Sequence, residues 1–156
     1  MNTLIELYDE RAIENVLAAD MFRPQRIVYL CPTEVAQSRE RQEQIGDFFR
    51  HRGWNPELIF LEASLYKVDR IVRQLLAISE KYPDCALDVT GGSDAELFAA
   101  GLFAAQANVR VSLTPGKRIG SIIFPEQSLR KICPAIFCTL LKIFSLWQAV
   151  HCSPVG

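Results

Sequence analysis

The apolar positions of the chain follow two alternating periods. Short runs rich in β-branched and aromatic residues predict strands at residues 3–8, 26–31, 57–63, 85–91 and 109–114. Longer segments with apolar residues at helical spacing predict helices at residues 10–22, 34–53, 65–83 and 94–108. This alternation is typical of a Rossmann-like α/β fold, in which an open parallel sheet has helices on both faces and right-handed crossovers.

Two of the predicted helices have a clear apolar face that we expect to pack on the sheet. In the helix at residues 10–22 this face contains Ile13, Val16, Leu17 and Met21. In the helix at residues 65–83 the face contains Val68, Ile71, Val72, Leu75, Leu76 and Ile78.

The pattern changes after residue 114. Residues 115–118 (Pro-Gly-Lys-Arg) predict a hairpin turn into a sixth strand at residues 120–125. That connection is too short for a crossover, so the last strand is expected to be antiparallel. We therefore expect one domain over residues 1–128.

Residues 129–156 form an apolar tail that we do not expect to fold as a separate domain. Lys142 is the only charged residue within 132–150, and that segment is long enough to span a membrane. Its apolar residues recur near helical spacing, which favours a docked or dimer-forming helix over a membrane span.

Composition narrows the function classes. The chain has 156 residues and a net charge of −1, which suits one domain and gives no overall basic field for duplex nucleic acid. Its five cysteines form no Cys-x-x-Cys pair, and His51 and His151 lie far apart, so neither a zinc site nor a disulfide framework is expected. We expect no metal and no cofactor. Charged residues near the start argue against a signal peptide and favour a cytoplasmic location.

The segment after the fourth predicted strand carries the strongest candidate chemistry. Thr90, Gly91, Gly92 and Ser93 follow an apolar run and precede a small-residue helix. In open α/β sheets ligands bind beyond the carboxyl ends of the strands, and two glycines allow a close backbone approach. Ser93 suits a helix N-cap, where anions are favoured. The segment predicts a phosphate or hydroxyl cradle, although a tight turn with an ordinary cap explains the same residues.

Two other loops are expected at the same edge of the sheet. Residues 8–11 follow the first strand; Asp9 and Glu10 suit a helix start, and Arg11 is either a phosphate contact or a solvated cation. Residues 32–34 follow the second strand, where Thr33 either caps the next helix or donates a hydrogen bond to a ligand. If the strand order reverses beside the first strand, residues 8–11 face the glycine pair across the crevice.

Four segments together resemble a known family. They are LIELYDERAIENV, RIVYLCPTE, LDVTGGSDAELFAA and VSLTPGK, which fall within residues 3–125. This set resembles the CRISPR-associated Rossmann-fold (CARF) sensor domains that precede a nuclease domain in CARF-nuclease effectors of antiviral defence, and the Thr-Gly-Gly-Ser element is its most specific part. The resemblance implies a homodimer whose loops line one symmetric pocket for a cyclic oligoadenylate. It implies a sensing domain that is not itself catalytic.

Two departures from the family pattern affect this expectation. Asp94 stands where the family often has a lysine, and its carboxylate would repel phosphate; Lys117 and Arg118 are the candidate replacement cations. No Asp/Glu-x-Lys nuclease pattern follows residue 125, so the nuclease domain that the resemblance implies is absent from this sequence.

Two alternative functions therefore stay open. One is a ring nuclease, in which Thr90, Ser93 and Lys117 place the ribose 2′-hydroxyl in line with the phosphate. The other is a structural domain that has lost its ligand. The sequence assigns the ligand pocket to Tyr8, Asp9, Glu10, Arg11, Pro32, Thr33, Glu34, Thr90, Gly91, Gly92, Ser93, Lys117 and Arg118.

Overall fold

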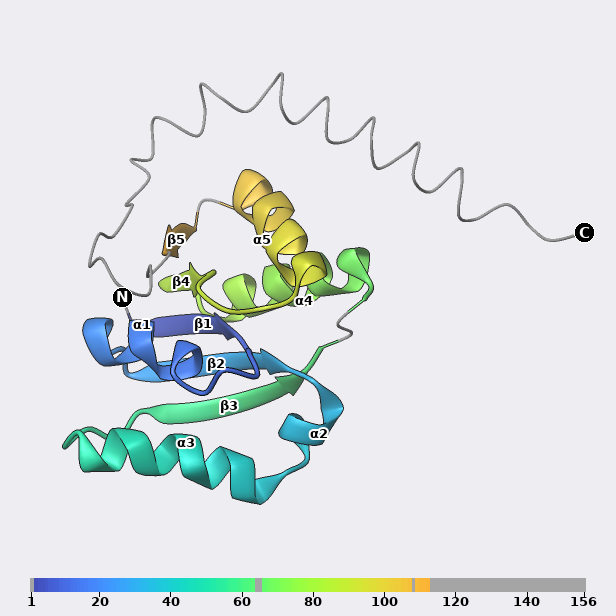
Figure 1. Ribbon diagram of the computed structural model, residues 1–156. Coiled ribbons are helices and arrows are strands. Elements are labelled where there is room, and N and C mark those ends of the chain that lie inside the picture. The colour runs from blue at the N-terminus through green and yellow to red at the C-terminus, as the bar shows by residue number, and fades with distance from the viewer. Residues whose placement is uncertain (1, 64–65, 108, 113–156) are drawn as a thin grey trace, which may run out of the picture. The chain divides into compact units, whose positions relative to one another are not determined.

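The computed structural model describes residues 2–63, 66–107 and 109–112 (Figure 1). In this part of the chain the strands are β1 (Thr3–Leu7), β2 (Arg26–Cys31), β3 (Glu57–Glu62), β4 (Cys85–Asp88) and β5 (Arg110–Ser112). The helices are α1 (Glu14–Phe22), α2 (Thr33–Ala36), α3 (Arg39–His51), α4 (Val68–Lys81) and α5 (Asp94–Gln106).

The strands form one parallel sheet in the order β3-β2-β1-β4-β5. β1 pairs with β2 on one side and with β4 on the other, so the strand order reverses between β1 and β4. This confirms the predicted Rossmann-like parallel sheet and its switch point beside the first strand. The predicted antiparallel strand, the apolar tail, Lys117 and Arg118 lie outside the described residues, and the boundary after residue 128 stays a prediction.

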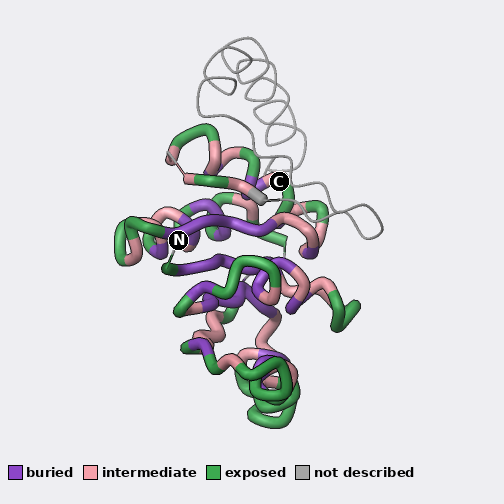
Figure 2. Tube along the Cα trace, turned by 90° about the vertical axis from the view of Figure 1, so that its left-hand side faces the viewer, coloured by how far each residue is buried: buried purple, intermediate pink, exposed green. Residues whose placement is uncertain are grey.

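Each face of the sheet has its own apolar core. One core joins α4 and α5 to the sheet through Ile71, Leu75 and Phe103, among others. The other joins α1 and α3 to the opposite face through Val16, Ala19 and Phe49, among others. Figure 2 shows that the buried backbone is concentrated in the strands between these two helical layers.

The helical pattern predicted α4 well and α1 poorly. The predicted stripe of α4 is confirmed, because Ile71, Val72, Leu75 and Ile78 are buried. The predicted face of α1 is wrong for two of its four members: Ile13 is 59% exposed and Met21 is 43% exposed.

The reason lies in what α1 buries in their place. This helix begins at Glu14, four residues later than predicted, and it packs Asn15, Val16, Ala18 and Ala19 inward. Alanine side chains let a helix lie close to the sheet. The buried face of α1 is therefore set by small residues, which a search for large apolar residues does not detect.

The single helix predicted at residues 34–53 is two helices. Ser38 separates them and caps α3, because its hydroxyl accepts a hydrogen bond from the Arg41 amide at 3.4 Å. Gln42 reaches back and donates to the carbonyl oxygens of Val35 and Ala36 at the end of α2. The backbone groups at the break between α2 and α3 are thus hydrogen-bonded to the side chains of Ser38 and Gln42.

Within the described ranges, no helix combines the length and the apolar character needed to cross a bilayer.

Candidate functional site

The loops after β1 and β4 pack directly against each other at the switch point. A Cβ atom on Gly91 would lie 2.8 Å from the carbonyl oxygen of Leu7 and 2.9 Å from the Cβ of Asp9. Gly92 has φ of +97°, and a Cβ there would lie 2.8 Å from the Cβ of Leu7. Gly91 is buried. The glycine pair is therefore required first for contact between the two loops, whereas the sequence interpretation assigned it to the approach of a ligand.

Thr90 is held by a buried carboxyl group at the end of β4. Its amide donates to Asp88 Oδ2 at 3.2 Å, and its hydroxyl donates to Asp88 Oδ1 at 3.0 Å. Asp88 has no exposed surface. Both polar groups that Thr90 was expected to offer to a ligand are thus bonded to the protein itself.

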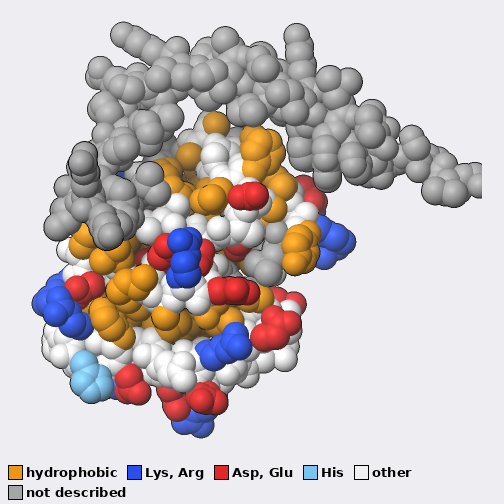
Figure 3. Space-filling view, in the orientation of Figure 1, with side chains coloured by type: hydrophobic (Ala, Val, Ile, Leu, Met, Phe, Trp, Pro, Cys, Tyr) orange, Lys and Arg blue, Asp and Glu red, His pale blue; other side chains and the backbone are white. Residues whose placement is uncertain are grey.

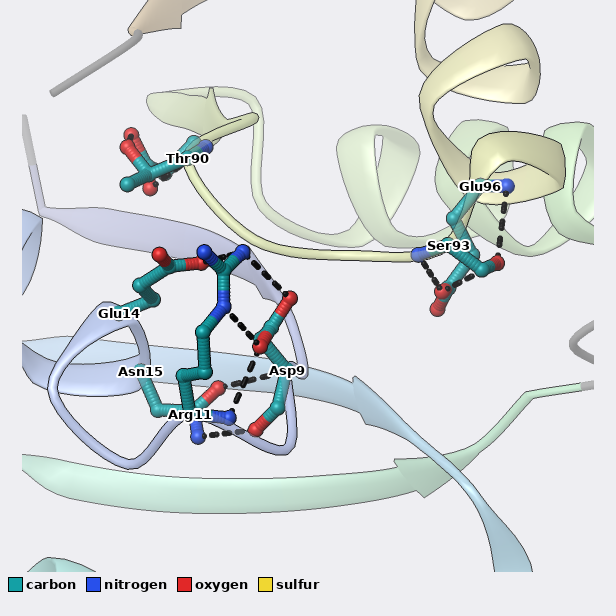
Figure 4. Close-up of polar contacts among 8 residues, drawn as sticks. Asp9, Arg11, Glu14, Asn15, Thr90, Ser93 and Glu96 are labelled. Carbon is teal, nitrogen blue, oxygen red and sulfur yellow. Dashed lines mark hydrogen bonds and ion pairs between the residues drawn. The ribbon is translucent and has the colours of Figure 1, made fainter. Parts of the chain in front are cut away.

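Ser93 forms a capping box at the start of α5 (Figure 4). Its amide donates to Glu96 Oε2 at 2.8 Å, and its hydroxyl accepts from the Glu96 amide at 3.4 Å. The predicted N-cap is confirmed. Burial raises the pKa of the Glu96 carboxyl, and the hydrogen bonds from Ser93 oppose that rise.

Asp9 lies where the two loops meet, and its carboxylate is bonded to Arg11 (Figure 4). It accepts hydrogen bonds from the Arg11 amide at 2.8 Å and from Arg11 Nε at 3.1 Å. The side-chain bond from Arg11 is the main reason that the pKa of Asp9 is lowered. Asp9 and Glu10 do not cap a helix, because α1 starts at Glu14.

Arg11 is paired, although 69% of its side chain is exposed. Its guanidinium contacts the Asp9 carboxylate on one side and Glu14 Oε2, at 2.6 Å, on the other. This exposure agrees with the solvated cation considered from the sequence, now paired with two carboxylates, and the phosphate contact stays a prediction. A phosphate that used Arg11 would have to compete with both carboxylates.

A buried asparagine fixes the shape of the β1–α1 loop. Asn15 accepts from the Asp9 amide at 2.7 Å and donates to the Asp9 carbonyl oxygen at 2.7 Å. The backbone carbonyl oxygen of Asn15 accepts a hydrogen bond from the Tyr29 hydroxyl at 2.7 Å. The sequence interpretation missed Asn15, whose signal was a polar residue on the inner side of a helix.

The amides of Thr90 and Ser93 therefore each donate to a carboxyl group of the protein. The Thr-Gly-Gly-Ser element has the donors of an anion cradle, and neighbouring carboxyl groups already engage two of them. Residues 8–14 and 88–96 contain a single cation, Arg11, among six carboxyl side chains. In Figure 3, acidic and basic side chains are interspersed over the described surface of one face.

Residues 32–34 lie at a second feature of the same sheet edge. They line a cavity of about 760 Å³ that reaches from the ends of β2 and β3 to the first turns of α4. Its other lining residues are Glu62, Ala63, Tyr66, Arg70, Arg73 and Gln74. Thr33 does not cap α2, because Pro32 occupies the cap position and makes no side-chain cap bond.

The α4 side of the cavity presents an aromatic ring and polar groups. Tyr66 is 85% exposed, and Arg70 is exposed as well. Gln74 Nε2 donates to the Glu62 carbonyl oxygen at 2.7 Å. The buried Oε1 of Gln74 has no hydrogen-bond partner in the described part of the chain. Arg73 Nη2 contacts Asp69 Oδ2 at 2.6 Å and lowers the pKa of Asp69.

The pocket that the sequence predicted is thus divided in the structure. Residues 8–11 and 90–93, which we call the crevice loops, pack against each other at the switch point between β1 and β4, whereas residues 32–34 line the cavity at the same sheet edge. The cavity residues of α4 were missed, because the stripe at residues 65–83 was interpreted for its apolar face alone. In the described ranges, no cluster of three or more His, Cys, Asp or Glu side chains is arranged to hold a metal ion.

Comparison with known proteins finds likeness in structure. No protein-family model matches the chain, and no curated protein sequence matches it. Can2 from Sulfobacillus thermosulfidooxidans, solved in complex with cyclic tetra-adenylate, matches 74% of this chain with a TM-score of 0.63 and 21% identity. Csm6 from Enterococcus italicus, bound to cyclic hexa-2′-fluoro-hexa-dAMP, matches 83% of it with a TM-score of 0.56 and 13% identity.

A third solved structure, protein VC1899 from Vibrio cholerae, matches 80% of the chain with a TM-score of 0.62 and 10% identity. The matched regions cover 32%, 36% and 33% of these three proteins, so the chain spans about a third of their length. At these identities the likeness establishes a shared fold, and that fold agrees with the family resemblance drawn from the sequence.

Proposed function

We propose that this chain is a CARF-type sensor domain that binds a cyclic oligoadenylate as a homodimer in the cytoplasm and is not itself catalytic. The observation that carries the proposal is the packing of the Thr90–Ser93 loop on the β1–α1 loop at the switch point. Ligands of open α/β sheets bind at such a point. The shared fold with two proteins solved with cyclic nucleotides gives further support. Any role in CRISPR-associated defence through an attached effector domain belongs to the same proposal.

The cavity supplies room for the bases of such a ring. Its volume of about 760 Å³ lies within the range of small-molecule sites. Tyr66 offers an exposed aromatic face, and stacking of a base on such a ring contributes roughly 1–3 kcal/mol. Gln74 lines the cavity, and its Oε1, which is buried and has no hydrogen-bond partner among the described residues, is an acceptor of the kind that suits the exocyclic amine of adenine. The ring of riboses and phosphates would then lie toward the crevice loops.

A two-fold ligand suits a two-fold dimer, because an isologous interface places identical loops around one axis. We therefore expect one ring for every two chains. Light scattering on the free chain at micromolar concentration tests the dimer separately. A monomer under those conditions would contradict the dimer and leave binding by a single chain as the remaining form of the proposal.

Calorimetric titration of the full chain with cyclic tetra-adenylate and cyclic hexa-adenylate tests the function. Saturable binding to one of the rings, with linear tetra-adenylate as the non-binding control, is the expected result. The ligand is then recovered and separated by chromatography. An intact ring supports a sensor, a linear product identifies a ring nuclease, and the absence of binding to both rings contradicts the proposal.

A further inference from the structure

Two carboxyl side chains lie side by side beneath the crevice loops. Glu6 in β1 is paired in register with Asp88 in β4, and their exposures are 1% and 0%. Paired residues of a parallel ladder carry their side chains on the same face of the sheet, so the two carboxyl groups are buried next to each other. Two ionised carboxylates have acceptors only and repel each other, whereas a proton on one of them lets it donate to the other. Burial of the pair therefore favours one shared proton.

The surroundings of Glu6 favour its protonated form. Among the described residues, the titratable groups that act on it are Asp88 from β4 and Tyr29 from β2, while the backbone of Ala19 in the packed helix α1 favours the ionised form and partly opposes the rise in pKa. Burial, followed by the charge of Asp88, raises the pKa of Glu6 well above its ordinary value. Glu6 Oε1 has no hydrogen-bond partner among the described residues.

The other member of the pair holds the Thr-Gly-Gly-Ser element. Asp88 accepts the amide proton of Thr90 on one oxygen and its hydroxyl proton on the other. Because the Thr90 hydroxyl gives its only proton to Asp88, it can act toward any other group only as an acceptor. The direction of that hydroxyl is therefore tied to the charge and position of Asp88.

We propose that Glu6 and Asp88 form a proton-sharing unit that positions Thr90, so that the ligand affinity of the crevice depends on pH. The ligand part of this inference rests on the proposed function; the proton part does not. Loss of the shared proton leaves two buried carboxylates facing each other. Their repulsion moves Asp88, and the hydroxyl of Thr90 moves with it.

The sign of the pH effect on stability follows from the raised pKa. The folded chain keeps a proton on Glu6 that the unfolded chain releases near pH 4.5. Stability is therefore fully present below that pH, and it falls as pH rises toward the folded pKa. In this window the equilibrium constant for unfolding rises by up to about tenfold per pH unit.

Urea unfolding across pH 5 to 9 tests the proton with the variant Glu6→Gln. Glutamine keeps the shape of the side chain and donates to Asp88, and it has no proton to lose. We expect the rise in the unfolding constant in the wild type, a clearly smaller rise in Glu6→Gln, where the raised pKa of Glu96 still contributes, and the full rise in Glu57→Gln, an exposed control at the start of β3. A wild type without the rise, or a Glu6→Gln variant that keeps all of it, overturns the proton-sharing unit.

Should Glu6→Gln fail to fold, carboxyl ¹³C NMR of the wild type reports the same titration. The expected result is a carboxyl assigned to Glu6 that titrates well above pH 4.5, distinct from Glu96, whose pKa is also raised. Titration of the Glu6 carboxyl near the ordinary value overturns the proposal.

Titration with cyclic tetra-adenylate across the same pH range tests the positioning of Thr90. We expect wild-type affinity to fall about tenfold or more as pH rises through the window, and Glu6→Gln to be independent of pH. Thr90→Val should lose the pH dependence of binding and keep that of stability, because its Glu6–Asp88 pair is intact. Wild-type affinity that does not change with pH overturns the positioning and leaves the proposed function standing. No binding at any pH overturns both, while the unfolding data still decide the proton.

Discussion

The crevice between β1 and β4 and the cavity beside β2 and β3 share one edge of the sheet, and they use their side chains differently. In the crevice, Thr90, Ser93 and Arg11 all contact carboxyl groups of the same chain. In the cavity, Tyr66 and Arg70 are exposed around a volume of about 760 Å³. The crevice loops carry the hydroxyl and amide groups that the sequence predicted for the site, and the cavity has a volume that can hold part of a ligand.

This difference separates two effects that a loss-of-function variant usually mixes. Substitutions in the crevice change contacts that hold the loops together, so they should first change the free energy of unfolding. Substitutions of exposed cavity residues leave the packing intact, so they should change ligand affinity alone. We therefore expect variants of the two regions to differ in whether stability or affinity changes.

The largest effect is expected from a methyl group in the crevice. Gly91→Ala places a Cβ 2.8 Å from a backbone oxygen that cannot move aside easily, and overpacking of this kind lowers the free energy of unfolding by about 2–3 kcal/mol. The matched control is Gly101→Ala on α5, where nothing lies within 4 Å. That change should stabilise the chain by about 0.5–1 kcal/mol, because glycine disfavours a helix interior. Urea denaturation measures both.

Equal stability changes in the two glycine variants would show that the crevice loops do not pack as described. The burial of Gly91 against Leu7 is the reason that the main effect of a side chain at this position is expected on the fold.

The next largest effect is expected in the cavity, on binding alone. Tyr66→Ala removes a stacking face and should weaken the binding of cyclic tetra-adenylate about tenfold, equivalent to about 1.4 kcal/mol. The free energy of unfolding should change by less than about 0.5 kcal/mol, because the side chain is 85% exposed. Arg70→Ala should behave in the same way. Calorimetry and urea denaturation on the same samples provide the two readings, and unchanged affinity in both variants would exclude the cavity from the site.

The smallest effect compares two serine caps. Ser93→Ala removes a capping box with Glu96 and should lower the free energy of unfolding by about 1 kcal/mol. Ser38→Ala removes a single hydrogen bond of 3.4 Å at the start of α3 and should have about half that effect. Thermal and urea unfolding rank the two. A larger effect at Ser38 would mean that the crevice is less tightly held than its hydrogen bonds suggest.

The fold was predictable because its signals are local and repeated. Apolar runs marked all the strands that the structure describes, and the stripe from Val68 to Ile78 marked α4. The face of α1 was not predictable by the same means, because Ala18 and Ala19 do the packing and Ile13 is exposed. Periodicity locates large buried side chains, and it gives no signal where a helix packs through small ones.

The sequence predicted which loops of the candidate site lie together, and it predicted less about the contacts within them. Parallel strands place residues 8–11 and 90–93 at one edge, and their contact follows from the strand order. Two of the partners are local, because Asp88 lies two residues before Thr90 and Glu96 lies three residues after Ser93. The pairing of Glu6 with Asp88 was not predictable in the same way, because it depends on the register between β1 and β4. A carboxyl group within each of the apolar runs LIEL and CALD was the available signal. A buried acid in a strand requires a partner, and the parallel register supplies one.

Amide hydrogen exchange of the full chain, with and without cyclic tetra-adenylate, tests most directly whether the crevice and the cavity form one ligand site. If they form one site, binding should slow amide exchange in three segments: residues 8–11, residues 90–93 and residues 66–74 of the cavity wall. The far end of the sheet, around Gly53 and Tyr82, should be unchanged. Binding that protects neither the crevice loops nor the start of α4 would contradict the account.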